Sequence, residues 1–519
     1  MKNDMAKESV WSRAATPAGA LQDGERVEVL VIGAGIAGLS VAYELTRRGI
    51  PALVVDDGPV GGGQTGRTSA HLASALDDRY YQLASIRGED AARLAAESHA
   101  AAIDEIERIV AAEAIDCGFA RVSGYLVLAE GDDPEVLDRE LAAGTRAGIA
   151  LARLPDAPIA SFRSGPCLEF RDQAEMNPMQ YLDGLVRAVE KAGGRLLTGV
   201  HVRGVATSAS DRKVTLEDGR TILAGSVVVA TGSPINDLFA VHTKQAAYLT
   251  YVVALRIPNG VMPHLLLWDT GDPYHYVRCV ADPAQPGQEL LLVGGEDHKT
   301  GQDDGHAPRA QRLEAWARQR FPFAKERAYA WSGQVYETLD GLGYIGADPG
   351  SQEGVFVVTG DSGMGLTHGV IAGRLLADLI TGVENPWTAL YDPSRKVPLA
   401  IGDYVRENAN VAAQYASWLT RGDYEALDQI PHGSGAILRD GAHKLAVYKD
   451  AAGQVTTRSA TCPHLAAVVV WNDGEKTWDC PAHGSRFDCK GKVIQGPANT
   501  DLVEVVDEQP EAMLPAPAD

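Results

Sequence analysis

The chain has 519 residues, 45% apolar and 22% charged, which is the composition of a folded globular protein long enough for more than one domain. Wholesale disorder and fibrous repeats are therefore excluded. Lys and Arg number 47 against 69 Asp and Glu, so the net charge is −22. This charge disfavours nucleic acid and anionic membranes as partners.

The N-terminal sequence MKNDMAKESV lacks the apolar stretch of a signal peptide, and no segment is long and apolar enough to span a bilayer. We therefore expect a cytoplasmic protein without membrane insertion. Three of the six cysteines fall within 28 residues near the C-terminus. In a long chain from a reducing compartment this grouping indicates a metal site. Nothing in the sequence indicates an oligomeric state.

The N-terminal residues, 1–26, are polar and aperiodic, and we expect an extended arm. Residues 27–32 form a short apolar run typical of a buried strand, followed by helical periodicity to about Arg48. Further elements are expected in this order: a strand over 53–55, a long helix over 87–115, a helix and strands over 180–235, strands over 245–295, a strand over 355–359, a helix over 367–381 and a helical connector over 401–429. From about residue 430, short strands and turns mark another domain, over 430–511.

The sequence Gly33-Ala-Gly35-Ile-Ala-Gly38 lies between the first strand and the first helix. Such glycines allow a tight turn, close approach of a pyrophosphate and packing of helix on strand, and Asp56 ends the next strand, placed to bind ribose hydroxyls. The alternative is a glycine turn without a nucleotide. Because only one complete motif of this kind is present, we expect the reductant to be the substrate itself and not NAD(P)H.

Residues 27–400 resemble the FAD-dependent oxidoreductases of the D-amino acid oxidase and glycine oxidase superfamily. The resemblance rests on the glycine motif, the loop GGGQTGRTS at 61–69, the strand 227–230 with its following Thr-Gly, and the turn GDSGMGLT at 360–367. It implies an α/β fold: a Rossmann-like FAD-binding domain (about 27–80, 180–240 and 340–400) with a mixed-sheet substrate domain (about 81–179 and 241–339).

The same resemblance implies which residues contact FAD. They are Gly33, Gly35, Gly38, Asp56, Gln64, Thr65, Thr68, Ser69, His71, Val202, Gly232, Asp361, Gly365, Leu366 and Thr367. Asp56 departs from the family, which more often has Glu there. Some relatives bind flavin covalently through a histidine near the position of His71, but we expect this ring to pack on the flavin without a bond.

The segment from Tyr274 to Arg278 reads as a strand whose alternation places Tyr274, Tyr276 and Arg278 on one face. In flavin amino-acid oxidases, Arg and Tyr often hold the substrate carboxylate, and a guanidinium suits this task. Arg278 either does so or pairs with an acid elsewhere. Tyr251, on a neighbouring run, is expected to line the same cavity, so the catalytic candidates are Tyr276, Arg278 and Tyr251.

Two short motifs near the C-terminus, Cys462-Pro-His464 and Cys480-Pro-Ala-His483, each supply one thiolate and one imidazole. In a Rieske [2Fe-2S] cluster, two Cys hold one iron and two His hold the other. Zinc also accepts Cys₂His₂, but its fingers run Cys-Cys then His-His, whereas this order alternates. The residues from 430 onward resemble a small all-β Rieske domain throughout.

This Rieske-like segment departs from many relatives at two kinds of position. Ala467 and Ala482 replace a cysteine pair that elsewhere forms a disulfide, so the loops must be held by packing and hydrogen bonds. Phe487 stands where high-potential members have Tyr, while Ser485 remains able to donate to a cluster sulfur. Fewer such hydrogen bonds lower the potential, and we expect about −150 to +100 mV.

Together these motifs predict an FAD-dependent oxidoreductase that oxidises an amine or amino acid by hydride transfer. Its Rieske cluster would relay electrons to an external one-electron protein acceptor. Three alternatives stay open: a simple oxidase that makes hydrogen peroxide, reverse electron flow from a partner to the flavin, and a non-enzymatic redox carrier or sensor.

Overall fold

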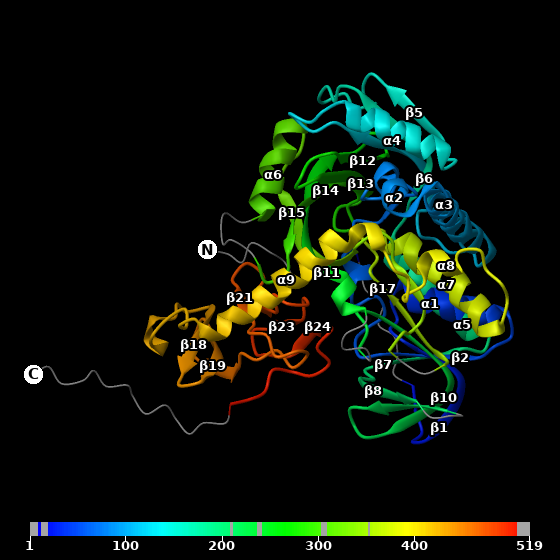
Figure 1. Ribbon diagram of the computed structural model, residues 1–519. Coiled ribbons are helices and arrows are strands. Elements are labelled where there is room, and N and C mark those ends of the chain that lie inside the picture. Colours follow the sequence, from blue (N-terminus) through cyan, green and yellow to red (C-terminus); the bar gives the residue numbers. More distant parts are fainter. Residues whose placement is uncertain are drawn as a thin grey trace, which may run out of the picture. The chain divides into compact units, whose positions relative to one another are not determined.

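The computed structural model describes residues 9–11, 19–207, 211–235, 241–302, 309–350 and 353–505 (Figure 1). It divides into two compact units. The first comprises Met1–His298 and Gly305–Tyr404, and the second comprises Lys299–Asp304 and Val405–Asp519. Within the described ranges, no helix is both long and apolar enough to cross a membrane.

The first sheet of the larger unit has the strand order β16-β17-β10-β1-β2-β7, with β9 and β8 attached to β10. Its strands are β1 (Glu25–Ile32), β2 (Ala52–Asp56), β7 (Arg195–Thr198), β8 (Val202–Thr207), β9 (Arg212–Leu216), β10 (Thr221–Gly232), β16 (Tyr344–Ala347) and β17 (Val355–Thr359). β1 is parallel to both neighbours, with Leu30 opposite Val227 on β10 and Leu53 on β2. Strands covered on both faces are apolar at successive positions, which explains the continuous apolar run of β1.

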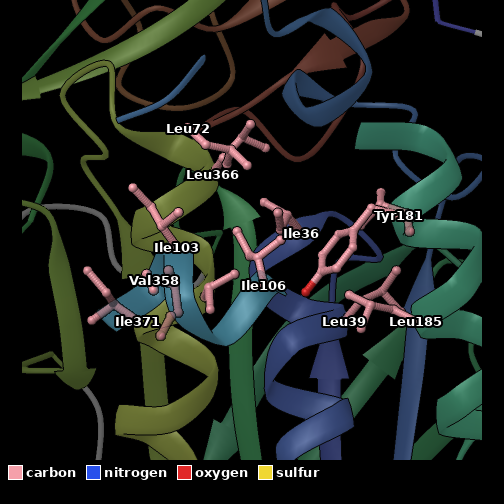
Figure 2. Packing of buried hydrophobic residues seen from close by; sticks show 14 of the residues in the cluster. Ile36, Leu39, Leu72, Ile103, Ile106, Tyr181, Leu185, Val358, Leu366 and Ile371 are labelled. Atoms are coloured by element: carbon pink, nitrogen blue, oxygen red, sulfur yellow. The ribbon is translucent and has the colours of Figure 1, made fainter. Parts of the chain in front are cut away.

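Four helices pack on one another beside this sheet: α5 (Pro178–Lys191) and α7 (Gly365–Thr381) contact α1 (Ile36–Arg47), and α3 (Glu89–Ala112) contacts α7. Figure 2 shows Ile36 and Leu39 of α1 packed together with Ile106 of α3 and Tyr181 of α5. A Cβ on Gly369 of α7 would lie only 2.8 Å from Ile36 Cγ2. This close approach brings α7 against α1 near the beginnings of both helices.

The second sheet has the strand order β15-β11-β14-β13-β12-β4-β6-β3, with β5 on β6. Its strands are β3 (His71–Leu72), β4 (Ala120–Val127), β5 (Leu151–Leu154), β6 (Cys167–Glu175), β11 (Gln245–Pro258), β12 (Leu266–Asp269), β13 (His275–Ala281), β14 (Gln288–Lys299) and β15 (Arg327–Thr338). β12 and β4 are parallel, whereas β13 and β14 are antiparallel, so the sheet is mixed. The remaining helices of this unit are α2 (Tyr80–Arg87), α4 (Glu135–Arg146), α6 (Arg309–Arg320) and α8 (Thr388–Tyr391).

The second unit is all-β apart from the stretch that begins at Val405, which contains part of α9 (Ile401–Gln414) and 3₁₀ turns at Tyr415–Leu419 and Leu427–Gln429. One sheet contains β18 (Ser434–Asp440), β19 (His443–Lys449) and β20 (Val455–Ser459), and the other β21 (Val470–Asn472), β22 (Thr477–Asp479), β23 (Arg486–Asp488) and β24 (Val493–Gln495). Trp478 and Phe487 are fully buried in its core. The expected fold class, an α/β oxidoreductase with a small all-β domain, is confirmed.

One local expectation is confirmed and another needs correction. The long helix expected over 87–115 is α3, and Gly88, whose φ of +87° suits glycine, separates it from α2. The N-terminal segment is not simply a polar arm, because Val10 and Trp11 are buried in the main core. Two apolar residues without periodicity carry no signal of an element.

Candidate functional site

The three glycines after β1 are required for different reasons. Gly33 has a φ of +112°, and a Cβ there would lie 2.4 Å from the Ala230 carbonyl oxygen. A Cβ on Gly38 would lie 1.9 Å from the Gly33 carbonyl oxygen. At Gly35, by contrast, only the Thr65 hydroxyl among described atoms would lie within 4 Å, at 3.2 Å. The fold itself therefore requires Gly33 and Gly38, while Gly35 leaves room that fits a pyrophosphate.

Asp56 closes the same turn from the end of β2. Its carboxylate accepts the N–H of Ala34 at 2.6 Å through Oδ2 and that of Gly58 at 2.7 Å through Oδ1. Burial raises the pKa of Asp56 to about 6. A carboxylate has about four lone-pair sites, so these two bonds leave capacity for ribose hydroxyls. The Val200 N–H donates to the Asp56 carbonyl at 2.9 Å. This bond holds the segment that leads into Val202 at the same edge of the sheet.

The loop that follows is shaped by its own side chains. The Thr65 hydroxyl accepts the Ile36 N–H at 3.1 Å, and the Gln64 side-chain oxygen accepts the Gln334 N–H at 2.7 Å. The Thr68 hydroxyl accepts the Ala70 N–H at 3.0 Å. These three side chains, expected to contact FAD, hold the loop between α1 and β15 and so position its backbone.

Sequence reasoning missed two residues that hold this loop from the N-terminal side. The Ser9 hydroxyl donates to the Gly66 carbonyl at 2.6 Å, and the Trp11 indole N–H donates to the Thr68 carbonyl at 2.7 Å. The available signal was a single Trp in a polar stretch.

His71 is neutral and uses both ring nitrogens. Nε2 lies 3.3 Å from the Val277 carbonyl, which can only accept, so Nε2 carries the proton. Nδ1 then accepts from the Ser69 hydroxyl at 2.9 Å. Burial and the charge of Arg278 lower the pKa of His71 to about 3. This arrangement fits a ring that packs without a covalent bond to flavin.

The late glycine turn brings α7 to the same region. No side chain of the described residues caps α7, so the N–H groups of Gly365, Leu366 and Thr367 form its positive end, which suits a flavin ring that becomes anionic on reduction. The Thr367 hydroxyl donates to the Met364 carbonyl at 3.1 Å and accepts from His99 Nδ1 at 2.8 Å.

The strand ends beside this turn are joined to one another. The Thr359 hydroxyl at the end of β17 donates to the carbonyl of Gly232, which ends β10, at 2.6 Å. Asp361, just beyond β17, is half-buried, and its removal from water raises its pKa to about 6. The candidates Gly232 and Asp361 are therefore held at adjacent strand ends next to the start of α7.

Arg278 does not have the free guanidinium that a substrate carboxylate requires. It is 3% exposed, donates to the carbonyls of Ala70 and Ser69, and lies 3.4 Å from the carboxylate of Glu175. The geometry thus favours the structural alternative, in which Arg278 ties β13 to the loop before β3. A distant partner such as Glu175 leaves no local mark in the sequence.

Tyr251 lies on the other face of the sheet from Tyr276. Tyr251 belongs to the cluster that contains Val277 and stacks on His298 at 5.8 Å, whereas Tyr276 packs against the main core. Side chains alternate along β11, so its neighbour Thr250 faces Tyr276 and the two hydroxyls lie 3.0 Å apart. The expectation that Tyr251 and Tyr276 line one cavity is therefore wrong, and Thr250 takes that place.

Tyr276 packs edge-on to His71 at 5.5 Å and lies 5.7 Å from Tyr274, between ring centroids. The Tyr274 hydroxyl donates to Asp77 Oδ2 at 3.2 Å. Tyr274, Tyr276 and Thr250 thus form a hydroxyl-bearing surface next to the loop that contains His71. Asp77, which the sequence reasoning missed, belongs to this surface.

In the second unit the two cysteine–histidine loops meet. The Cys462 and Cys480 thiols lie within hydrogen-bond reach of each other. The Cys480 thiol, and after it the backbone of His464, the Ser485 hydroxyl and the backbone of Leu465, lower the pKa of Cys462. The His464 and His483 rings lie 5.0 Å apart, nearly perpendicular. A thiolate pair with donors around it and an adjacent imidazole pair fit the two irons of a [2Fe-2S] cluster. In the described chain, no three His, Cys, Asp or Glu side chains gather as for a single metal ion.

Hydrogen bonds from outside each loop hold these ligands in place. At the first loop, the Tyr415 hydroxyl donates to the Leu465 carbonyl at 2.6 Å, and the Trp418 indole N–H donates to the Ala466 carbonyl at 3.0 Å. The Gln302 side chain donates to the carbonyl of Pro481, next to Cys480, at 2.9 Å. These contacts clamp both loops in a chain that has Ala467 and Ala482 where many relatives have a disulfide.

Comparisons with known proteins agree with this geometry. A family model described as FAD dependent oxidoreductase matches residues 28–379, and one described as Rieske [2Fe-2S] domain matches residues 424–507. The chain belongs to the FAD dependent oxidoreductase family and carries a C-terminal Rieske domain. Its cofactors are accordingly FAD and a [2Fe-2S] cluster, as expected, and the chain is an FAD-dependent oxidoreductase.

Particular relatives share one or both parts. The putative Rieske 2Fe-2S iron-sulfur protein YhfW of Bacillus subtilis (strain 168) is 30% identical over 492 residues, which cover 94% of each chain. Glycine oxidase from Geobacillus kaustophilus matches with a TM-score of 0.59 at 20% identity, over 72% of this chain and 100% of that one. L-proline dehydrogenase from P. horikoshii matches with a TM-score of 0.57 at 18% identity, over 72% and 98%. These two structures show the fold.

Proposed function

We propose that this protein oxidises an amine or amino acid at FAD and passes the electrons, one at a time, through its Rieske cluster to an external acceptor. The observation that carries the proposal is the presence of both sites in one chain. A two-electron centre fused to a one-electron centre is suited to relay, because a flavin exchanges electrons singly or in pairs and the cluster only singly.

The described residues supply binding and orientation. The turn at Gly35 would bind the pyrophosphate, and Asp56 would bind the ribose. The flavin ring would lie between the loop that ends at His71 and the start of α7. When bound, FAD accepts a hydride from the carbon next to the substrate nitrogen. Tyr274, Tyr276 and Thr250 would orient the substrate, so that catalysis works mainly through positioning.

In the second unit, Cys462 and Cys480 would hold one iron, and His464 and His483 the other. The N–H groups and the Ser485 hydroxyl around the sulfurs tune the potential, because donors to sulfur stabilise the reduced cluster. The acceptor is a one-electron protein partner.

An anaerobic titration of the holoenzyme with a panel of amines and amino acids tests this function. Flavin and cluster absorbance are followed together, and a productive substrate should bleach the flavin first and the cluster next. In a parallel assay in air, peroxide formed at the rate of substrate oxidation while the cluster stays oxidised would identify a simple oxidase. Flavin that is reduced only by reductants acting through the cluster would identify reverse electron flow. If no organic substrate reduces the flavin at all, the protein is a non-enzymatic redox carrier.

A further inference from the structure

The charges of three carboxylates act on Tyr274 at the proposed substrate side. They come from separate elements: Asp77 from the loop after β3, Asp297 from β14 and Glu337 from β15. Asp77 accepts the Tyr274 hydroxyl at 3.2 Å. Burial first, and then the negative charge of these three groups, raise the pKa of Tyr274 well above its ordinary value. We call Asp77, Asp297 and Glu337 the carboxylate cluster.

The carboxylate cluster lies where two cofactor segments meet. A Cβ on Gly363, in the turn that starts α7, would lie 2.5 Å from Asp77 Oδ2. On the other side, Tyr276 contacts His71 of the loop expected at the flavin ring and lies 3.0 Å from the Thr250 hydroxyl. The carboxylates therefore flank the place assigned to the reacting end of the flavin.

A backbone irregularity turns Asp297 onto this face. Gly295 has a φ of +133° and Glu296 a φ of +59°, an uncommon value for a residue with a side chain. Glu296 consequently faces α6, where it pairs with Arg312 at 2.6 Å, and the next residue, Asp297, faces Tyr274. A regular strand would place Asp297 on the α6 face instead.

One carboxylate oxygen of the cluster lacks a protein partner. Among the residues that the structure describes, no donor reaches Asp297 Oδ1, although the atom is buried. The hydroxyls of Thr250 and Tyr274 face the same carboxyl group. Burial raises the pKa of Asp297 to about 7 and that of Asp77 to about 6. A buried acceptor without a donor is costly, and a bound cation would satisfy it.

The arginines around the carboxylate cluster are engaged with backbone carbonyls. Arg278 holds Ala70, Arg79 donates to the Asp77 carbonyl at 2.7 Å, and Arg309 donates to the Glu296 carbonyl at 3.0 Å. A substrate carboxylate placed here would meet like charge from the carboxylate cluster.

We propose that the substrate is an alkylammonium ion without a carboxylate on the carbon to be oxidised, bound by Asp77 and Asp297 against Tyr274 and Tyr276. This inference rests on the proposed function and names its substrate class. In the reaction the substrate loses a hydride from carbon, accepted by FAD, and a proton from nitrogen, accepted by a carboxylate or by water. The resulting imine is hydrolysed by water to a carbonyl compound and an amine or ammonia.

Binding can be measured apart from turnover with a pair of probes of similar shape. tert-Butylamine has no hydrogen on the carbon next to nitrogen and cannot be oxidised there, and pivalate replaces its ammonium by a carboxylate. Calorimetric titration of the oxidised holoenzyme should show binding of tert-butylammonium and not of pivalate. Binding of pivalate, or of neither probe, would overturn the inference.

Two isosteric variants locate the effect. Asp297→Asn should weaken tert-butylammonium binding about 10- to 100-fold, because a charge-assisted hydrogen bond is lost. Asp183→Asn on α5 is the matched control, because Asp183 is not among the groups whose charge acts on Asp77, Asp297 or Tyr274, and it should leave binding nearly unchanged. Unchanged flavin and cluster spectra show that both variants fold. Equal affinities for wild type and Asp297→Asn would contradict the proposal.

The affinity should also rise with pH through about 7. Asp297 ionises there, while an alkylammonium with a pKa of about 10 stays charged. The groups that face Asp297 are Asp77, Arg309, Thr250, Tyr274 and Tyr276. Asp77 ionises near pH 6 and acts in the same direction, so Asp297→Asn should remove the upper part of the rise. A flat profile in the wild type would contradict the assignment.

The outcome also separates this inference from the proposed function. If glycine, sarcosine or L-proline reduce the flavin and carboxylate-free amines such as putrescine do not, the substrate class is wrong and the proposed function stands. If tert-butylammonium binds through Asp297 but no amine reduces the flavin, the cation site is supported and the proposed function fails.

Discussion

At the residue scale, Gly35 differs from Gly33 and Gly38 because the protein alone does not require it. Gly35→Val should give a folded protein that retains its cluster spectrum but lacks FAD, because the branched side chain takes the space left for the pyrophosphate. Bound flavin is measured by absorbance after purification. Gly402→Val, at a helical position with no described atom within 4 Å, is the control and should keep FAD. Normal FAD content in Gly35→Val would show that the pyrophosphate lies elsewhere.

Residues in contiguous motifs could be predicted from the sequence, and residues placed by long-range packing could not. Cys462, His464, Cys480 and His483 lie in two short loops, and their spacing already indicates the chemistry. Asp297 faces the site only because the strand is irregular at the two preceding residues, which no periodicity reveals. Tyr251 was misplaced for the related reason that a strand offers two faces and the sequence alone does not say which one meets the flavin.

At the element scale, the segment after α9 acts as a clamp on the first cluster loop. Tyr415→Phe combined with Trp418→Phe removes two hydrogen bonds to the Leu465 and Ala466 carbonyls, about 1–3 kcal/mol in total. We expect the cluster to be lost faster on warming, while the FAD content stays unchanged. The visible absorbance of the cluster measures this loss. Tyr424→Phe, in the same connector and 38% exposed, should behave like wild type. Cluster loss at the wild-type rate would show that packing alone holds the loop.

The elements themselves were predictable where one signal dominated. The apolar run over 27–32 lies in β1, and the glycine turn at 360–367 leads into α7, because each has a strong local pattern. The long helix expected over 87–115 is α3, which begins directly after Gly88, where the chain adopts a positive φ.

At the scale of the whole molecule, each unit has its own core. The Rieske unit is built around Trp478 and Phe487, and the buried clusters of the oxidoreductase unit contain none of its residues. Loss of a cluster ligand should therefore leave the flavin site folded. This independence allows electron flow to be interrupted at one cofactor while the other is observed.

The Cys480→Ala variant uses that independence to test the relay. Removing one thiolate should prevent cluster assembly, while FAD stays bound and its anaerobic reduction by substrate keeps a near-normal rate, because the flavin site draws on other residues. Electron transfer to a one-electron protein acceptor should then be lost, as measured by acceptor reduction in stopped flow. Ser485→Ala is a milder variant. It should keep the cluster but lower the reduction potential of the cluster, because the Ser485 hydroxyl faces the Cys462 sulfur. If Cys480→Ala reduces the acceptor as fast as wild type, electrons leave directly from the flavin and the cluster is not their route.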